Sequence, residues 1–405
     1  MRGGGTMEYS TAIGKLHGLG MFGGKLGLSR IRALDKKLGW PSRKLRCVLV
    51  AGSNGKGSVA TMIARGLEES GAKTALYVSP HLDTPRERIS INGKMISKSE
   101  MAEEYARVER AARGMKDKPT FFELFTAMAL DYFARRGVEW AVLEVGLGGR
   151  LDATNIVEPE LSVVTRVDLE HTARLGSTIE KIAHEKAGVM RQGRLCVTGA
   201  KGGALAALIR EADEKGAHLV AVHTKYSGKL ALLGEHQKRN AAVAEEALRR
   251  ICVNGSAIAR GLARARMIGR LEVVGRKPLV FHDCAHNPAA ARELAAAVRG
   301  MRLRQPLVLV FGAMRDKDYE GVLAALAPLA RTIVVNRPQL ERAEEAGKLA
   351  EAARKYNKNV RVVEDVQKSV REARKIAGKR GTVLVAGSIY MLAEARRKNE
   401  LQIDG

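Results

Sequence analysis

The sequence predicts an α/β protein made of two doubly wound domains, each with a mostly parallel sheet between layers of helices. Short apolar strands alternate with helical segments from residue 48 to residue 165, and a second alternating series begins near Gly269. A chain of 405 residues is long enough to form two domains with separate cores. We expect an N-terminal domain over residues 1–268 and a smaller, Rossmann-like C-terminal domain over residues 269–405.

The N-terminal domain contains a strand, a glycine-rich turn and a helix in direct succession. Residues 48–51 are apolar, residues 52–58 read Gly-Ser-Asn-Gly-Lys-Gly-Ser, and residues 59–64 continue at helical spacing. Backbone N–H groups at a helix start, together with the helix dipole, attract an anion. Lys56 is suited to the terminal phosphates of a nucleotide, and Ser58 to Mg²⁺. The turn is shorter than the usual phosphate-loop pattern, but the order of its parts favours a P-loop over a simple glycine-rich turn.

Further strands and helices follow at the spacing that this architecture requires. In the N-terminal domain we expect strands at 74–78, 140–145 and 161–165, and helices at 99–113, with Ser99 as N-cap, and at 121–135. In the C-terminal domain we expect a helix at 289–298 and strands at 278–283, 307–311, 332–335, 360–363 and 382–386.

Polar residues lie in or just after two strands of the N-terminal domain. Glu144 stands in an apolar strand that leads into the glycine-rich loop 145–155, and His171 lies just after the strand at 161–165. Ligands bind at the carboxyl ends of strands in open α/β sheets, so Glu144 is suited to hold Mg²⁺ in a nucleotide site. The alternative for Glu144 is a solvent-facing acid, which its apolar neighbours disfavour. The position of His171 at a strand end beside the phosphate loop makes it a candidate metal ligand, and the alternative is a surface or core histidine that binds no metal.

The composition describes a basic globular protein with few aromatic residues. The formal net charge is +25, and aromatic residues make up 4% of the chain. Nucleic-acid-binding proteins usually add aromatic stacking surfaces or a docking motif to their basic residues, and here the basic residues are spread along the chain. We therefore expect anionic small-molecule partners, and neither a nucleic-acid nor a membrane partner.

The sequence also gives expectations for the location, the oligomeric state and the cysteines of the protein. No apolar run reaches the length of a membrane span, and no secretory pattern follows Met1, so we expect a cytoplasmic protein, and a monomer. Cys47, Cys196, Cys252 and Cys284 are far apart in apolar surroundings. We expect four buried thiols rather than disulfides or a zinc site.

Many short segments occur in the same order in one known family. They are residues 51–58, 79–82, 87–93, 120–123, 144–155, 171–172, 185–188, 234–237 with Asn240, 269–272, 283–288, 311–313 with 316–318, and 387–390. With these motifs the chain resembles, over nearly its whole length, the folylpolyglutamate synthase/dihydrofolate synthase family of Mur-ligase-like ATP-dependent amide ligases. The resemblance implies an N-terminal P-loop ATPase domain of the Mur-ligase central type and a C-terminal glutamate ligase domain.

The resemblance also implies an activity. A ligase of this family uses ATP to add L-glutamate to the carboxylate of a folate, of dihydropteroate, or of both, through an acyl phosphate, and releases ADP and phosphate. The implied cofactors are one or two Mg²⁺ ions, with K⁺ as a further candidate.

The resemblance assigns roles to individual residues. The implied catalytic residues are Lys56, Lys186 and His286. The implied ATP-binding residues are Ser53, Asn54, Gly55, Lys56, Gly57 and Ser58, with Asn240, Arg270 and Asp283 as the adenine, phosphate and ribose contacts. The implied metal ligands are Ser58, Ser79, Glu144 and His171. The implied pterin-binding residues are Thr120, Phe121, Phe122, Glu123, Leu151, Asp152 and Ala153.

Lys186 matches a lysine that is carbamylated in the family. A salt bridge from Lys186 to an acid such as Glu170 is the alternative. Three departures from the family pattern concern fine geometry: Ser53 replaces a threonine, Cys284 replaces a glycine, and Asp168-Leu169-Glu170 replaces Gly-Leu-Asp.

Three other functions stay open at this point. Another Mur-like ligase would join an amino acid to a cell-wall precursor or to another carboxylate, and would lack the pterin segments. A nucleotide-binding module without catalysis is disfavoured because Lys56, Glu144, His171, Lys186 and Asp283 occur together. A basic nucleic-acid-binding protein would bind random DNA at physiological salt.

Overall fold

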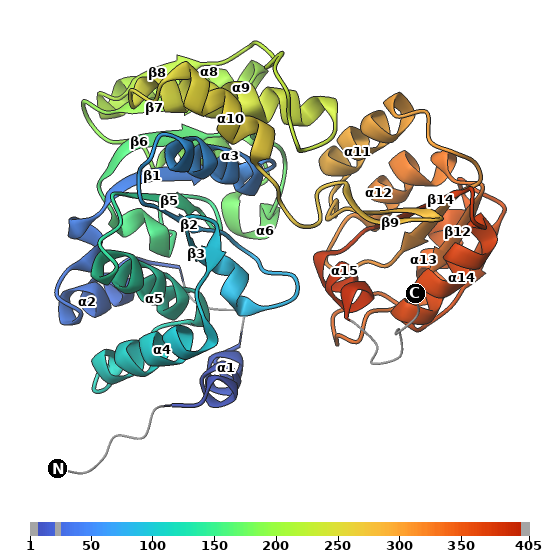
Figure 1. Ribbon diagram of the computed structural model, residues 1–405, viewed down its shortest axis with the longest axis horizontal. Coiled ribbons are helices and arrows are strands. Elements are labelled where there is room, and N and C mark those ends of the chain that lie inside the picture. The colour runs from blue at the N-terminus through green and yellow to red at the C-terminus, as the bar shows by residue number, and fades with distance from the viewer. Residues whose placement is uncertain (1–6, 21–25, 398–405) are drawn as a thin grey trace. The chain divides into compact units, whose positions relative to one another are not determined.

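The computed structural model describes residues 7–20 and 26–397, which form two compact units (Figure 1). The first unit contains the described residues up to Ala231 together with Arg239–Ala265. The second unit contains Leu232–Lys238 and the described residues from Arg266 onward. Each unit has its own α/β sheet, so the predicted class is confirmed. The boundary that we predicted at residues 268 and 269 stays a proposal for the functional domains.

The first unit is built on an eight-stranded sheet in the order β4-β3-β2-β5-β1-β6-β7-β8. The strands are β1 (Arg46–Ala51), β2 (Thr74–Tyr77), β3 (Ile89–Ile91), β4 (Lys94–Met95), β5 (Trp140–Glu144), β6 (Pro159–Val164), β7 (Leu195–Thr198) and β8 (His218–Ala221). The strands from β2 to β8 in the sheet order pair in parallel, and β3 and β4 add an antiparallel edge.

Helices cover both faces of this sheet. They are α1 (Tyr9–Gly18), α2 (Ser29–Lys37), α3 (Lys56–Glu69), α4 (Lys98–Ala112), α5 (Phe121–Arg135), α6 (Thr172–Leu175), α7 (Ile179–Ala187), α8 (Gly202–Lys215), α9 (Glu235–Arg250) and α10 (Gly255–Arg264). Alternation along β1 puts Cys47, Leu49 and Ala51 into a core shared with α1, α2, α4, α5, α7 and α8. Val48 and Val50 are buried on the opposite face, where α3 packs on the sheet and against α10 (Figure 1).

The second unit is built on a six-stranded sheet in the order β13-β12-β11-β14-β10-β9. The strands are β9 (Glu272–Arg276), β10 (Leu279–His282), β11 (Leu307–Phe311), β12 (Thr332–Val335), β13 (Val360–Val362) and β14 (Thr382–Ala386). Only β9, at one edge, pairs antiparallel. One core contains residues of α11 (Pro288–Gly300), α12 (Tyr319–Leu326) and α13 (Ala346–Arg354), and α14 (Val366–Ala377) and α15 (Ile389–Arg396) contact the central strands as well.

Two local predictions are wrong. Ser97 rather than Ser99 caps α4, because the Ser97 hydroxyl accepts the Glu100 N–H at 3.2 Å while the Glu100 carboxylate accepts the Ser97 N–H at 2.8 Å. Cys252 is exposed, because it lies in the turn after α9 with a φ of 63°, whereas the other three cysteines are buried. Among the described helices, none combines the length and the apolar character needed to span a bilayer.

Candidate functional site

The predicted phosphate loop joins β1 to α3 and is tightly packed. Gly55 precedes α3 with a φ of 92°, and a Cβ on Gly55 would lie 2.7 Å from Asn240 Oδ1. A Cβ on Gly52 would lie 1.8 Å from Thr165 Oγ1. Both glycines are therefore needed for space as well as for backbone conformation. The predicted adenine contact Asn240 lies against this loop.

The segment after β6 holds the loop in place. The Ser53 N–H donates to Arg166 O at 2.7 Å, and Thr165 Oγ1 donates to Asn54 O at 2.9 Å. Ser53 Oγ donates to Asp168 O at 2.9 Å and accepts the Asp168 N–H at 3.0 Å, while Asn54 Nδ2 donates to Asp168 Oδ2 at 2.9 Å. The chain's own hydrogen bonds thus shape the loop.

Two lysines and one carboxylate lie beside the loop. Lys56 Nζ donates to the carbonyl oxygens of Gly52 at 2.9 Å and Ser53 at 3.1 Å. Lys186 is 1% exposed and its Nζ donates to Glu170 Oε1 at 2.8 Å. The salt bridge given above as the alternative for Lys186 is therefore present.

The protonation of this cluster follows from burial and charge. Burial raises the pKa of Glu170, but the Lys56 and Lys186 cations outweigh burial and hold that pKa at about 2. Burial lowers the pKa of Lys186 to about 8, although Glu170 pulls it upward. Glu170 is therefore ionised at neutral pH, and Lys186 loses its proton more readily than an ordinary lysine.

The predicted metal ligands include one acid and one histidine. Glu144 is 4% exposed, pairs with Val50 across β5 and β1, and accepts the Ser79 N–H at 2.9 Å. Ser58 is buried in the first turn of α3, and His171 precedes α6 with a φ of 46°. Within residues 7–20 and 26–397, no group of three or more His, Cys, Asp or Glu side chains is arranged to hold a metal. This donor set fits Mg²⁺, which takes few protein ligands and completes its shell with water and nucleotide phosphates.

Residues 120–123 are the N-cap and the first residues of α5, and all four have contacts within the fold. The Thr120 hydroxyl accepts the Glu123 N–H at 3.3 Å, and Glu123 accepts the Thr120 N–H at 2.7 Å and Arg30 Nε at 3.0 Å. Phe121 is 3% exposed, with its ring 5.3 Å from that of Phe125. Phe122 is half-buried against Gly146, so it is the residue of this segment that presents a partly exposed ring.

The other predicted pterin segment contains one exposed and two buried residues. Leu151 is 37% exposed, whereas Asp152 and Ala153 are buried. Asp152 accepts the Leu147 N–H at 2.9 Å, and the N–H and hydroxyl of Thr154 at 3.0 and 2.6 Å. Burial raises the pKa of Asp152 against these hydrogen bonds. Asp152 therefore shapes the loop around Leu151.

The second unit holds the remaining predicted site residues, at the end of β10. Asp283 is 7% exposed and accepts the N–H groups of Leu271 at 2.9 Å and Ala285 at 2.8 Å. Burial raises the pKa of Asp283, while the Arg270 guanidinium opposes that change. The His286 Nδ1–H donates to the Cys284 carbonyl at 2.9 Å, which orients the imidazole. Asp283, Arg270 and His286 thus lie in one short stretch of structure.

Cys284 is a buried thiol. Burial raises its pKa to about 12, so the sulfur stays protonated and does not act as a nucleophile at neutral pH.

Sequence reasoning missed the partners of the phosphate loop. Thr165 and Asp168 contact Asn54 from more than a hundred residues away in the chain. The available signal was their place at the end of a strand next to β1, because the carboxyl ends of parallel strands share one edge of a sheet.

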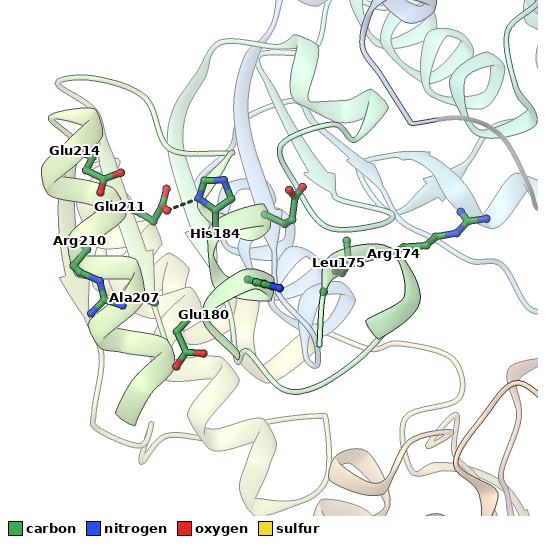
Figure 2. A pocket seen from close by; sticks show the side chains of 11 residues that line it. Arg174, Leu175, Glu180, His184, Ala207, Arg210, Glu211 and Glu214 are labelled. Atoms are coloured by element: carbon green, nitrogen blue, oxygen red, sulfur yellow. Dashed lines mark hydrogen bonds and ion pairs between the residues drawn. The ribbon is translucent and has the colours of Figure 1, made fainter. Parts of the chain in front are cut away.

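A cavity of about 500 Å³ is lined by residues of α6, α7 and α8 (Figure 2). Its lining is charged, with Arg174, Glu180, Lys181, His184, Arg210 and Glu211 among its residues. Figure 2 shows His184 facing Glu211, its hydrogen-bond partner. None of the predicted site residues lines this cavity.

Two family models match most of the chain. Residues 50–221 match the Mur ligase middle domain, and residues 269–389 match the Mur ligase, glutamate ligase domain.

Curated relatives match both units. The chain is 40% identical over 425 residues to the probable bifunctional folylpolyglutamate synthase/dihydropteroate synthase of Haloferax volcanii, with 96% of this chain and 50% of that protein covered. It is 34% identical over 426 residues to the dihydrofolate synthase/folylpolyglutamate synthase of Bacillus subtilis, with 96% of this chain and 99% of that protein covered. The chain thus spans about half the length of the bifunctional folylpolyglutamate synthase/dihydropteroate synthase relatives that it matches.

Solved structures are similar over the same extent. Escherichia coli FolC in complex with DHPP and ADP matches with a TM-score of 0.88 and 32% identity, over 95% of this chain and 96% of that one. The bifunctional folylpolyglutamate synthase/dihydrofolate synthase of Yersinia pestis, complexed with AMPPNP and Mn ion, matches with a TM-score of 0.86 and 31% identity, over 97% and 98% of the two chains.

Proposed function

Because the chain belongs to the folylpolyglutamate synthase/dihydrofolate synthase family of Mur ligases, we propose that it uses ATP to join L-glutamate to a folate or dihydropteroate carboxylate. The observation that supports this proposal most is the phosphate loop 52–58, which contains Lys56 and has the buried ion pair Lys186–Glu170 beside it. Relatives solved with ADP, or with AMPPNP and Mn ion, support a nucleotide and a divalent metal as ligands.

The proposed reaction has two steps. A carboxylate oxygen of the acceptor attacks the γ-phosphorus of ATP, the bond to the bridging oxygen breaks, and ADP leaves with an acyl phosphate remaining. The amine of L-glutamate then attacks the acyl carbon, phosphate leaves, and the amine loses a proton as the amide forms. Activation is needed because an unactivated carboxylate has no adequate leaving group.

The first unit supplies the groups that meet phosphate charge. Lys56 and the N–H groups at the start of α3 stabilise the negative charge on the transferring phosphoryl group. Ser58, Ser79, Glu144 and His171 would hold Mg²⁺, which supplies further charge stabilisation when bound. Asn240, Arg270 and Asp283 are proposed nucleotide contacts, and His286 a residue near the reacting carboxylate.

Phe122 and Leu151 are the proposed direct pterin contacts. Both expose apolar surface, whereas Thr120, Phe121, Glu123, Asp152 and Ala153 are proposed to act by holding these two segments in shape. Phe122→Ala should therefore raise KM for the pterin, and because the ring also packs beside Tyr77 the fold of the variant is checked by circular dichroism.

We also propose that Lys186 carries a carbamate in the active enzyme. The neutral amine attacks CO₂, a C–N bond forms, and the amine proton leaves to solvent, so that a carboxylate replaces the ammonium. Its burial at 1% exposure would protect the adduct from water. Carbon-13 NMR with labelled bicarbonate should show a protein-bound carbamate that is lost in Lys186→Arg, and a fully active enzyme without that signal would refute the carbamate.

A phosphate-release assay tests the main proposal. ATP and L-glutamate are supplied with dihydropteroate, folates of increasing glutamate length, and cell-wall-type carboxylates, and mass spectrometry follows each product. We expect phosphate release that requires both glutamate and a pterin acceptor, with a product heavier by one glutamyl residue. Release with a non-pterin acceptor alone would favour another Mur-type ligase. K⁺ as a further ion, a cytoplasmic location and a monomeric state stay predictions.

A further inference from the structure

The second unit carries a strongly basic surface where the amino ends of its parallel strands lie. Five connections lead into the amino ends of its parallel strands, at residues 277–278, 301–306, 330–331, 355–359 and 378–381. Together they contain eight Lys and Arg residues and no Asp or Glu. All eight are exposed, and we call them the basic edge: Lys277, Arg302, Arg304, Arg331, Lys355, Lys358, Lys379 and Arg380.

The opposite edge of the same sheet has the reverse balance. The connections that leave the carboxyl ends of the strands, at 283–287, 312–318, 336–345, 363–365 and 387–388, contain eight acidic and four basic residues. The two sets of connections therefore differ in the sign of their net charge. The basic edge is also the edge away from the carboxyl ends of the strands, where ligands of open α/β sheets bind.

The five connections lie side by side. Leu279 N–H donates to Gly381 O at 3.1 Å, and Thr382 Oγ1 donates to Arg304 O at 2.8 Å. Arg331 N–H donates to Leu307 O at 2.8 Å, and Asn359 Nδ2 donates to Arg331 O at 3.1 Å. The cations therefore follow the sheet order from β10 through β14, β11 and β12 to β13. At about 4.8 Å per strand, this row is about 19 Å long.

The protein does not neutralise this row within the described residues. Lys355 forms an ion pair with Glu320 at 3.0 Å, and the other seven cations have no carboxylate partner among residues 7–20 and 26–397. Cations near helix C-termini are stabilised by the dipole, which is one reason for basic residues after α11, α13 and α14. That reason does not apply to Lys277, which follows a strand, or to Arg331, which follows a short 3-10 helix.

The surroundings favour a nucleic-acid strand over a bilayer as the partner. Lipid surfaces are bound stably when apolar side chains insert beside the basic ones. The one large, well-exposed apolar side chain that the structure describes in these connections is Tyr356, at 40% exposure. A row of cations with one aromatic ring matches a phosphate backbone with a base stacked beside it.

We propose that the basic edge of the second unit binds the phosphate backbone of single-stranded nucleic acid without reading base sequence. This binding is separate from the ligase reaction and reverses our expectation from sequence of no nucleic-acid partner. That expectation depended on the low aromatic content and on basic residues being spread along the chain, whereas the fold gathers these eight cations at one edge together with the exposed ring of Tyr356.

Fluorescence anisotropy with a labelled 20-nucleotide oligothymidylate tests the proposal on the full chain. With about five phosphate contacts, the affinity should fall about 100-fold between 50 and 200 mM salt. A variant with Arg302, Arg304, Lys379 and Arg380 changed to Gln should bind far more weakly and lose most of this salt dependence. Its glutamate-dependent phosphate release should equal that of the wild type.

A second variant is the matched control. Arg110, Arg113, Lys116 and Lys118 are exposed in the first unit, and changing these four to Gln removes the same net charge. The control should keep wild-type affinity and salt dependence, and equal losses in the two variants would overturn the proposal. No measurable binding at 100 mM salt would also overturn it, as would tighter binding to phosphatidylglycerol vesicles or to poly-L-glutamate than to the oligonucleotide.

Discussion

The two units shape the carboxyl edges of their sheets in different ways. In the first unit, the phosphate loop lies beside a network of charged side chains in which Glu170 is close to both Lys56 and Lys186. In the second unit, the buried Asp283 accepts two backbone N–H groups and holds the chain around it. A network of ion pairs can rearrange when a phosphate arrives, whereas a buried acid cannot leave its N–H partners without a large cost. We infer that the charged network beside the phosphate loop can respond to changing charge, whereas the surface around Asp283 is fixed.

The largest effect on activity is expected for a substitution of Lys56 in the first unit. Lys56→Ala should lower glutamate-dependent phosphate release by about 10²–10³-fold, because a cation facing the transferring phosphoryl group is lost. Lys36→Ala, at an exposed position of α2, serves as the control and should leave the rate unchanged. Near wild-type release by Lys56→Ala would remove phosphoryl-transfer chemistry from the first unit.

The next prediction concerns the pH dependence of the free energy of unfolding, which the buried His282 of the second unit should influence. Burial lowers the pKa of His282 to about 4, helped by the Arg396 and Arg374 cations. The unfolded chain therefore binds the extra proton first, and stability present above pH 6.5 is lost as the pH falls toward 4. Preferential protonation of His282 in the unfolded chain should lower the free energy of unfolding by about 3 kcal/mol over that range.

His282→Leu should flatten this part of the stability curve, as measured by circular dichroism in urea. His218→Gln, at an exposed position, should keep the wild-type slope. Identical slopes for wild type and His282→Leu would show that other groups set the acid sensitivity.

Substitution of each buried acid, Asp152 or Asp283, should lower the stability of the unit in which that acid lies. Asp152→Ala and Asp283→Ala each leave buried N–H groups unpaired, at a cost of about 2 kcal/mol. Both tryptophans, Trp40 and Trp140, lie in the first unit, so fluorescence reports its unfolding and circular dichroism reports both units. A fluorescence midpoint that shifts with Asp283→Ala as much as with Asp152→Ala would mean that the units unfold together.

The smallest effect concerns the start of α5. Thr120→Ala should lower the free energy of unfolding by about 1 kcal/mol through loss of the N-cap, and Thr120→Ser should restore it. If the serine variant is stable but has a raised KM for the pterin, Thr120 contacts the substrate itself.

Local patterns in the sequence predicted much of the first unit. The loop 52–58, the position of Glu144 and the start of α5 each depend on neighbours a few residues away, so periodicity and turn chemistry were sufficient. The N-cap of α4 was misplaced by two residues because Ser97 and Ser99 are both suitable caps, and only the Glu100 contact distinguishes them.

Long-range contacts could not be predicted in this way. The bracing of Asn54 by Thr165 and Asp168 depends on β1 and β6 being neighbours in the sheet. The basic edge is a further case, because Lys277 and Arg380 are far apart in the chain and meet only where β10 lies beside β14. Neither arrangement could be predicted from local patterns, because the residues involved are far apart in the sequence.

The hydrogen bonds of Lys56 bear on nucleotide affinity. Lys56 already donates two of its three N–H groups, to Gly52 O and Ser53 O, so a phosphate that takes more than the third N–H must displace a carbonyl partner. Such an exchange yields little net free energy in the ground state, since one set of hydrogen bonds is traded for another. The trade becomes favourable as negative charge grows on the transferring phosphoryl group. ADP should therefore bind Lys56→Ala almost as tightly as the wild type, whereas phosphate release by the same variant should fall strongly.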